Sequence, residues 1–186
     1  MSSPSWRDDF LLLTPVNLLI TGFLLFWGNG FFSNRLIKTA LIVFGIGFFI
    51  EVIGVKTGAL FGEYYYGNPL GLKLFEVPLI IGVNWLVLSF SSTGIACKIF
   101  KSKMLQIVTS SFLLVALDFL IEPVAVKLDF WTWIHGDIPI KNYLMWFVTG
   151  LLVNGVVILC VDKIHFRTSL FVFFTQVYFF ALLNIL

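Results

Sequence analysis

Long apolar stretches alternate with short polar segments along the whole sequence. Each apolar stretch is close to the ~20 residues that an α-helix needs to cross a membrane. The pattern predicts about six transmembrane helices, which cover about residues 10–27, 36–54, 78–97, 104–126, 142–161 and 169–186. We therefore expect an all-α, polytopic membrane protein that forms a single integral membrane domain over residues 1–186.

Prolines and polar segments mark several of the expected helix ends. Pro15 lies near the first turn of the first span, and Pro78 is expected at the first helical position of the third, where a missing N–H costs little. Pro123 is expected to bend or end the fourth span. Residues 6–9 are expected at the membrane interface, and residues 29–34 are expected to form a turn. No small-residue cleavage site follows the first apolar run, so we interpret that run as a retained helix and not as a signal peptide.

The composition agrees with this fold class. Hydrophobic residues make up 59% of the chain and charged residues 12%, and the mean hydropathy is +1.00. These values exclude an ordinary soluble domain and a disordered chain. The two cysteines, Cys97 and Cys160, indicate no disulfide framework.

Basic residues fall unequally on the two sides of the predicted bundle. One side, formed by the loops after the first, third and fifth spans, carries Arg35, Lys38, Lys98, Lys101, Lys103, Lys163 and Arg167. The other side carries Arg7, Lys56, Lys73, Lys127 and Lys141. Cytoplasmic loops of membrane proteins carry an excess of lysine and arginine. This rule places the first group in the cytoplasm and both termini on the opposite side of the membrane.

The connection over residues 51–78 differs from the other connections. It begins with Glu51 at the end of an apolar stretch, contains several glycines and the consecutive tyrosines 64–66, and ends at Pro78. Irregular backbone is tolerated at membrane depth where it is packed against protein and lines a cavity. We therefore expect a partly embedded Gly/Tyr-rich loop between the second and third helices. The alternative is an interfacial loop with a belt of tyrosines.

Three acidic residues, Glu51, Asp118 and Glu122, lie in predicted spans without a lysine or arginine partner in the same span. Ionisable residues within a membrane are costly, and they are functional candidates for that reason. Asp118 and Glu122 are four residues apart and share one helix face, so the two cannot both ionise cheaply in a low dielectric. At least one of them is expected to be protonated and able to donate a proton. The alternative for Glu122 is an interfacial ion pair with Lys127.

Aromatic residues are expected at the same end of the bundle as these acids, because the topology brings both unusual loops there. They are Tyr64, Tyr65, Tyr66, Trp131, Trp133, Tyr143 and Trp146. Such residues can line an apolar substrate slot or stabilise a cation through their ring faces. The alternative is an aromatic belt at the membrane interface. Asn84, Trp85 and Asn142 can hold a water molecule or orient an acid.

The remaining motifs favour structural roles. Gly54 and Gly58 form a GxxxG motif, which is typical of close helix packing. His135 is expected in a loop and His165 on the opposite side of the membrane, so the histidines predict no metal site. We find no convincing internal repeat, no phosphate-binding glycine motif and no GxSxG element.

Several of these motifs together resemble a known enzyme family in their order and spacing. They are Glu51…Gly58…Phe61-Gly62-x-Tyr64-x-Tyr66…Leu70-Gly71…Val77-Pro78…Trp85, then Asp118…Pro123, Trp131-x-Trp133, Ile138-Pro139 and Asn142-Tyr143…Trp146. The pattern covers about residues 45–150. It is similar to that of the CruF-type membrane carotenoid hydratases, which include bisanhydrobacterioruberin hydratase and γ-carotene 1′,2′-hydratase.

The resemblance implies addition of water to the terminal C=C bond of an acyclic carotenoid end group, through a tertiary carbocation. For this chemistry we expect Asp118 to be the acid and Glu51 to be its partner or to orient the water, with Glu122 in the same catalytic group. The residues implied to bind substrate are Tyr64, Tyr66, Trp85, Trp131, Trp133, Asn142 and Trp146. This chemistry requires a general acid but no metal or redox cofactor.

The resemblance also implies a location and partners. We expect a multi-pass protein of the cell (inner) membrane that acts on a carotenoid dissolved in the bilayer. Other membrane enzymes of the carotenoid pathway are expected neighbours, and no feature indicates binding to nucleic acid.

Two other functions fit the same sequence. A carotenoid end-group cyclase of the lycopene type also begins by protonating an alkene, but an internal double bond then captures the cation. A carotenoid-binding or transport protein would need no catalytic acid. A proton-coupled transporter should carry ionisable groups across both halves of the bilayer, whereas the acids here crowd toward one end of the bundle.

Overall fold

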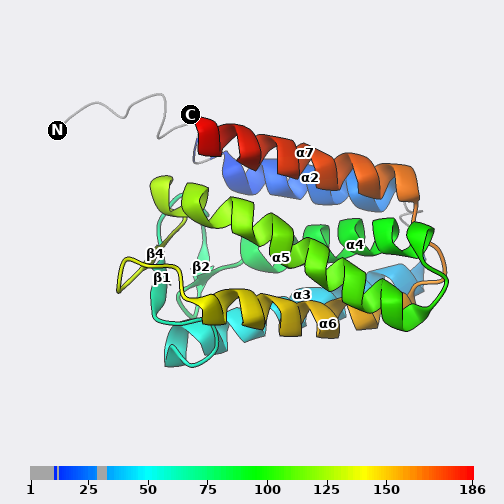
Figure 1. The fold of residues 1–186 in the computed structure, drawn as a ribbon, viewed down its shortest axis with the longest axis horizontal. Helices are drawn as coiled ribbons and strands as arrows, with labels where there is room; N and C mark the ends of the chain where they lie inside the picture. Colours follow the sequence, from blue (N-terminus) through cyan, green and yellow to red (C-terminus); the bar gives the residue numbers. More distant parts are fainter. Residues whose placement is uncertain (1–10, 12, 29–32) are drawn as a thin grey trace.

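The computed structural model describes residues 11, 13–28 and 33–186, and within these it forms a bundle of six helices (Figure 1). The helices are α2 (Thr14–Gly28), α3 (Asn34–Thr57), α4 (Ile80–Ile99), α5 (Lys103–Lys127), α6 (Ile140–Cys160) and α7 (Phe166–Ile185). Four short strands join them: β1 (Tyr64–Tyr66), β2 (Lys73–Leu74), β3 (Val77–Pro78) and β4 (Trp131–Trp133). The expected interfacial segment 6–9, the first residue of the first span and most of the turn at 29–34 lie outside the described residues.

The lengths and apolar character of the helices identify a multi-pass membrane protein. Five helices, α3 to α7, are long and apolar enough to cross a membrane, and α2 is a shorter apolar helix. Helix α4 lies at the centre, since 83% of its apolar stretch is buried against the rest of the bundle. On the surrounding helices many large apolar side chains point outward, as expected for surfaces that face lipid.

The helix ends agree closely with the sequence prediction, with one correction at a proline. The fourth span, for example, was expected over about residues 104–126 and is observed as Lys103–Lys127. Pro78 does not begin α4. It lies in β3 opposite Lys73, at a strand position where its missing N–H is tolerated. Pro123 lies inside α5, so of the two expected effects, a bend or an end of the helix, it does not produce an end.

The two unusual loops pair with each other, which the sequence did not predict. Strands β1 and β4 form an antiparallel sheet in which Tyr64 lies opposite Trp133 and Tyr66 lies opposite Trp131. Alternate residues of a strand share one face, so these four side chains point into the bundle and are buried. Tyr65 points the other way and is 54% exposed. Tyr65 therefore lies at the expected end of the bundle but does not face the site.

The same order of elements, helix–strand–helix, occurs twice in the described chain. Helix α3, strand β1 and helix α4 form one helix–strand–helix unit, and α5, β4 and α6 form a second, with the β2–β3 hairpin inserted only in the first. In each unit a glutamate lies near the end of the first helix, and the first and third residues of the strand that follows are aromatic. The two units meet through the antiparallel pairing of β1 with β4.

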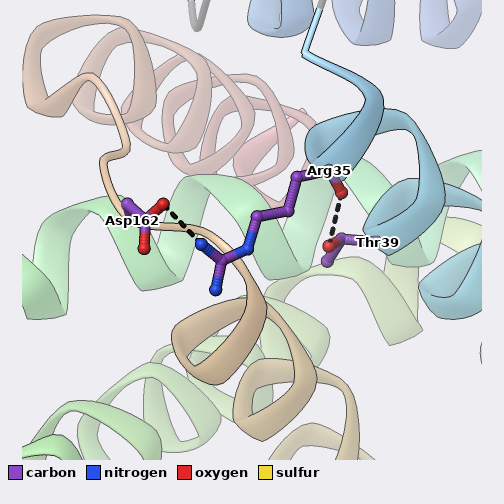
Figure 2. Close-up of polar contacts among 3 residues, drawn as sticks. All are labelled: Arg35, Thr39 and Asp162. Carbon is purple, nitrogen blue, oxygen red and sulfur yellow. Dashed lines mark hydrogen bonds and ion pairs between the residues drawn. The ribbon is translucent and has the colours of Figure 1, made fainter.

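The strands and the C-terminus lie at one end of the bundle, and the α4–α5 and α6–α7 connections lie at the other (Figure 1). At that far end Arg35 forms an ion pair with Asp162 at 2.6 Å, and its carbonyl accepts a hydrogen bond of 2.8 Å from the Thr39 hydroxyl (Figure 2). Both charged side chains are more than half exposed, so this pair contributes roughly 0–1 kcal/mol. The arrangement confirms that both unusual loops and the three acids gather toward the same end.

Candidate active site

Glu51 is held by three hydrogen-bond donors from residues that follow it in the chain. It lies near the end of α3 and is 4% exposed. The hydroxyls of Tyr64 and Tyr66 donate to Oε2 at 2.5 and 2.8 Å, and Trp85 Nε1 donates to Oε1 at 3.2 Å. Because alternate residues of β1 share a face, both hydroxyls reach the same oxygen.

Two glycines allow the chain to return onto α3 after Glu51. Gly58 ends the helix in the left-handed conformation at φ 63°, a backbone shape that favours glycine. At Gly54 a Cβ atom would lie 2.6 Å from Phe61 Cδ2 and 3.1 Å from the Tyr64 hydroxyl oxygen. Gly54 therefore admits the aromatic side chains of the loop that follows, and its interpretation as a helix–helix packing glycine is wrong.

Glu122 is held in the same manner in the second unit. It is 1% exposed, and both indole N–H groups of β4 donate to its Oε2, from Trp131 at 3.0 Å and from Trp133 at 2.9 Å. Asn142 Nδ2 donates to its Oε1 at 2.8 Å. Within the described part of the chain Glu122 forms no ion pair with Lys127. This burial excludes the alternative in which Glu122 is an interfacial residue.

Asp118 is fully buried one helical turn before Glu122. Its Oδ2 accepts a hydrogen bond of 3.0 Å from Asn142 Nδ2, the same nitrogen that donates to Glu122. Its Oδ1 is buried and has no hydrogen-bond partner among the described residues. Asn142 therefore links Asp118 to Glu122, and Asp118 has fewer donors than either glutamate.

A small cavity lies between the two glutamates. Its volume of ≈ 20 Å³ is sufficient for about one water molecule. The rings of Trp85 and Trp146 stack at a centroid distance of 4.5 Å beside it. Its lining is formed by Glu51, Phe61, Tyr64, Tyr66, Ile81, Asn84, Trp85, Glu122, Trp131, Trp133, Asn142 and Trp146.

The side chains that donate hydrogen bonds to the three acids are all neutral tyrosine, tryptophan and asparagine groups. No lysine or arginine forms an ion pair with Glu51, Asp118 or Glu122 in the regions that the structure describes. Burial, and then the neighbouring Glu51 carboxylate, raises the pKa of Tyr64 and of Tyr66 well above the usual tyrosine value. Both tyrosines therefore keep their hydroxyl protons at physiological pH and stay available as donors.

A comparison with protein families identifies the chain. The family model described as "Carotenoid biosynthesis protein" matches residues 13–186. The chain belongs to this family. This confirms the family resemblance seen in its motifs.

A curated protein with a named activity is similar to this chain. The chain is 29% identical over 125 residues to the bisanhydrobacterioruberin hydratase of Haloarcula japonica, and this match covers 60% of the chain. It spans 40% of the length of that relative. No solved structure matches the chain.

The structure of this carotenoid biosynthesis protein brings together nearly all of the site residues predicted from the sequence. Of these residues only Asp118 does not line the cavity, and it lies behind Asn142. Tyr143 packs against the ring of Phe119 and is not part of the lining. The sequence did not predict that Ile81 lines the cavity, because nothing distinguishes one apolar residue from the others in an apolar helix.

Metal-ligating residues are not clustered in the part of the chain that the structure describes, where no group of three or more His, Cys, Asp or Glu side chains can hold a metal ion. His135 is exposed and pairs with Glu63 at 3.5 Å in the loop region.

Proposed function

We propose that this protein is a carotenoid 1,2-hydratase that adds water to the terminal C=C bond of an acyclic carotenoid end group. The family membership supports a role in carotenoid biosynthesis, and a similar protein is named as a hydratase. The observation that carries the proposal is the pair of buried glutamates on either side of an aromatic cavity with room for about one water molecule.

The reaction requires a proton donor, a protected cation and one water molecule. A carboxyl group transfers its proton to the less substituted alkene carbon, and the π electrons form the new C–H bond. The resulting tertiary carbocation is stabilised by neighbouring aromatic ring faces. The water oxygen then forms the C–O bond, and a carboxylate accepts the released proton. Glu51 and Glu122, which line the cavity, supply the carboxyl groups that these steps need.

The enclosed cavity favours hydration over uncontrolled capture of the cation. Trp85, Trp146 and the aromatic residues of β1 and β4 exclude bulk water from the carboxyl groups. A single water beside a carboxylate would be oriented for attack and activated by loss of its proton. The carotenoid end group is larger than the cavity, so we expect the lining to open when the substrate binds.

We expect this reaction to take place within the membrane. Carotenoids dissolve in the bilayer, and the long apolar helices with their apolar outer faces support a bundle that lies in the same bilayer. We propose that the protein acts in the cell (inner) membrane, next to other membrane enzymes of carotenoid synthesis.

Pigment analysis in a host that makes an acyclic carotenoid tests the proposal. Expression of the chain should yield a pigment that is heavier by one water, and growth in ¹⁸O-labelled water should label its hydroxyl group. The Glu51→Gln/Glu122→Gln double variant should yield none, whereas the exposed control Glu63→Gln should behave as the parent protein. An isomer of unchanged mass would identify a cyclase, and unchanged pigment would favour a binding protein.

A further inference from the structure

The two glutamates are surrounded by chemically different donors, although their geometry is similar. Two of the three partners of Glu51 are tyrosine hydroxyls, from Tyr64 and Tyr66. A hydroxyl can donate a hydrogen bond or rotate and accept one. Glu51 therefore finds suitable partners both as a carboxylate and as a protonated acid.

Glu122 has partners that suit only the carboxylate form. Trp131 and Trp133 present indole N–H groups, which can donate but cannot accept. Asn142 presents its amide nitrogen, whose two hydrogens are shared between Glu122 and Asp118. A proton on a Glu122 oxygen would find no acceptor among these three partners.

Asp118 has no counterpart in the first unit. It lies four residues before Glu122, and the residue four before Glu51 is Gly47. A Cβ at Gly47 would lie 2.5 Å from Trp85 Cβ, so Trp85 packs directly on the backbone of α3 there. In the second unit Asp118 instead fixes the amide of Asn142. Asp118 therefore acts on the cavity through Asn142.

From these contacts we infer that Glu51 donates the proton to the alkene and that Glu122 is the carboxylate that orients the water and accepts its proton. Asp118 is a positioning residue that holds Asn142 against Glu122. This assignment depends on the proposed function and deepens it. During turnover the Glu51 O–H bond breaks as the C–H bond forms, and a water O–H bond breaks as Glu122 is protonated. A water molecule in the cavity then returns the proton from Glu122 to Glu51, so acid and base are restored.

Deuterium exchange separates the two glutamates experimentally. The purified chain in lipid nanodiscs is incubated in D₂O with lycopene, an acyclic carotene, and both product and recovered substrate are analysed by mass spectrometry. Glu122→Gln should form little product but still protonate the alkene reversibly, so that deuterium enters the end group of the recovered carotene. Glu51→Gln should give neither product nor deuterium, and Glu51→Asp should restore part of the exchange.

The outcomes distinguish a wrong assignment from a wrong function. If Glu51→Gln exchanges deuterium and Glu122→Gln does not, the assignment is overturned while the function stands. If the unmutated chain gives neither product nor deuterium, the proposed function itself fails. If it gives an isomer of the carotene together with deuterium exchange, hydration fails but the assignment of the proton donor is still tested by the same variants.

A double-mutant cycle tests the role of Asp118. Asp118→Asn should lower the turnover number and leave KM unchanged, and Asn142→Ala should lower the turnover number by a similar factor. The double variant should be no slower than Asn142→Ala alone, since contacting residues typically deviate from additivity by roughly 2- to 150-fold. Multiplying effects would overturn the positioning role, as would loss of deuterium exchange in Asp118→Asn.

Discussion

Replacing Tyr64 by phenylalanine removes a single hydroxyl from the Glu51 site and leaves the ring in place. Tyr66→Phe does the same from two residues further along β1, and Tyr65→Phe is a matched control because its side chain points away from the site. Hydrogen bonds to charged groups contribute ~1.5–3 kcal/mol, whereas side-chain hydrogen bonds in membrane proteins average ~0.6 kcal/mol. Each single variant leaves Oε2 with one donor, so we expect a loss of about 1 kcal/mol in unfolding free energy.

The double variant provides the sharper test. Without both hydroxyls Oε2 of Glu51 has no remaining donor among the contacts described, because Trp85 donates to the other oxygen. A buried acceptor without a partner costs about 1–3 kcal/mol, so Tyr64→Phe/Tyr66→Phe should lose more than the sum of the two single variants. Tyr65→Phe should stay within ~0.5 kcal/mol of the parent protein. The measurement is reversible unfolding in lipid bicelles. Equal losses for all three tyrosines would refute the bonding pattern at Glu51.

Three further predictions follow from other parts of the structure. Gly54→Ala places a Cβ 2.6 Å from Phe61 Cδ2 and should cost about 1–3 kcal/mol of unfolding free energy, whereas Gly45→Ala meets nothing within 4 Å and should be neutral or stabilising. The raised pKa of the two buried tyrosines of β1 keeps them protonated where the unfolded chain ionises. Their contribution to the free energy of unfolding should therefore be constant below pH ~10. Above that pH it should fall by up to about 1.4 kcal/mol per pH unit for each tyrosine. Unfolding curves measured at alkaline pH should show this loss for the parent protein but not for the Phe variants. In a background without native cysteines, Asp137→Cys should be labelled from outside the cell and Ser102→Cys from the cytoplasm, and the reverse pattern would invert the orientation inferred from the basic loops.

The positions of the helices could be predicted because each one depends on the apolar character of a single continuous stretch of sequence. A run of ~20 apolar residues has few alternatives to a membrane helix, and α3 to α7 were found close to their expected ranges. The convergence of Glu51 with Asp118 and Glu122 also followed, since consecutive spans alternate in direction. This prediction requires only the number of spans and the position of each acid within its span.

The contacts within the site could not be predicted, because they depend on pairing between distant segments. Strands β1 and β4 are three residues each and lie far apart in the sequence. Segments this short carry no strand periodicity of their own. The separation of Asp118 from the cavity was equally hidden, since residues 118 and 122 share a helix face and only the position of Asn142 distinguishes them.

The pairing of β1 with β4 couples the two glutamate sites structurally. Tyr64 and Trp133 lie opposite each other in the sheet, yet one donates to Glu51 and the other to Glu122. A shift of either strand by one residue would turn the donors of that strand to the outer face of the sheet, because the side-chain period is two. The carboxyl group that they serve would lose its strand donors, and the ring contacts of Tyr64 with Trp133 and of Tyr66 with Trp131 would be lost as well. The register of these six strand residues therefore helps to set the protein environment of both glutamates. A change in the strand of one unit also alters the packing of the strand in the other.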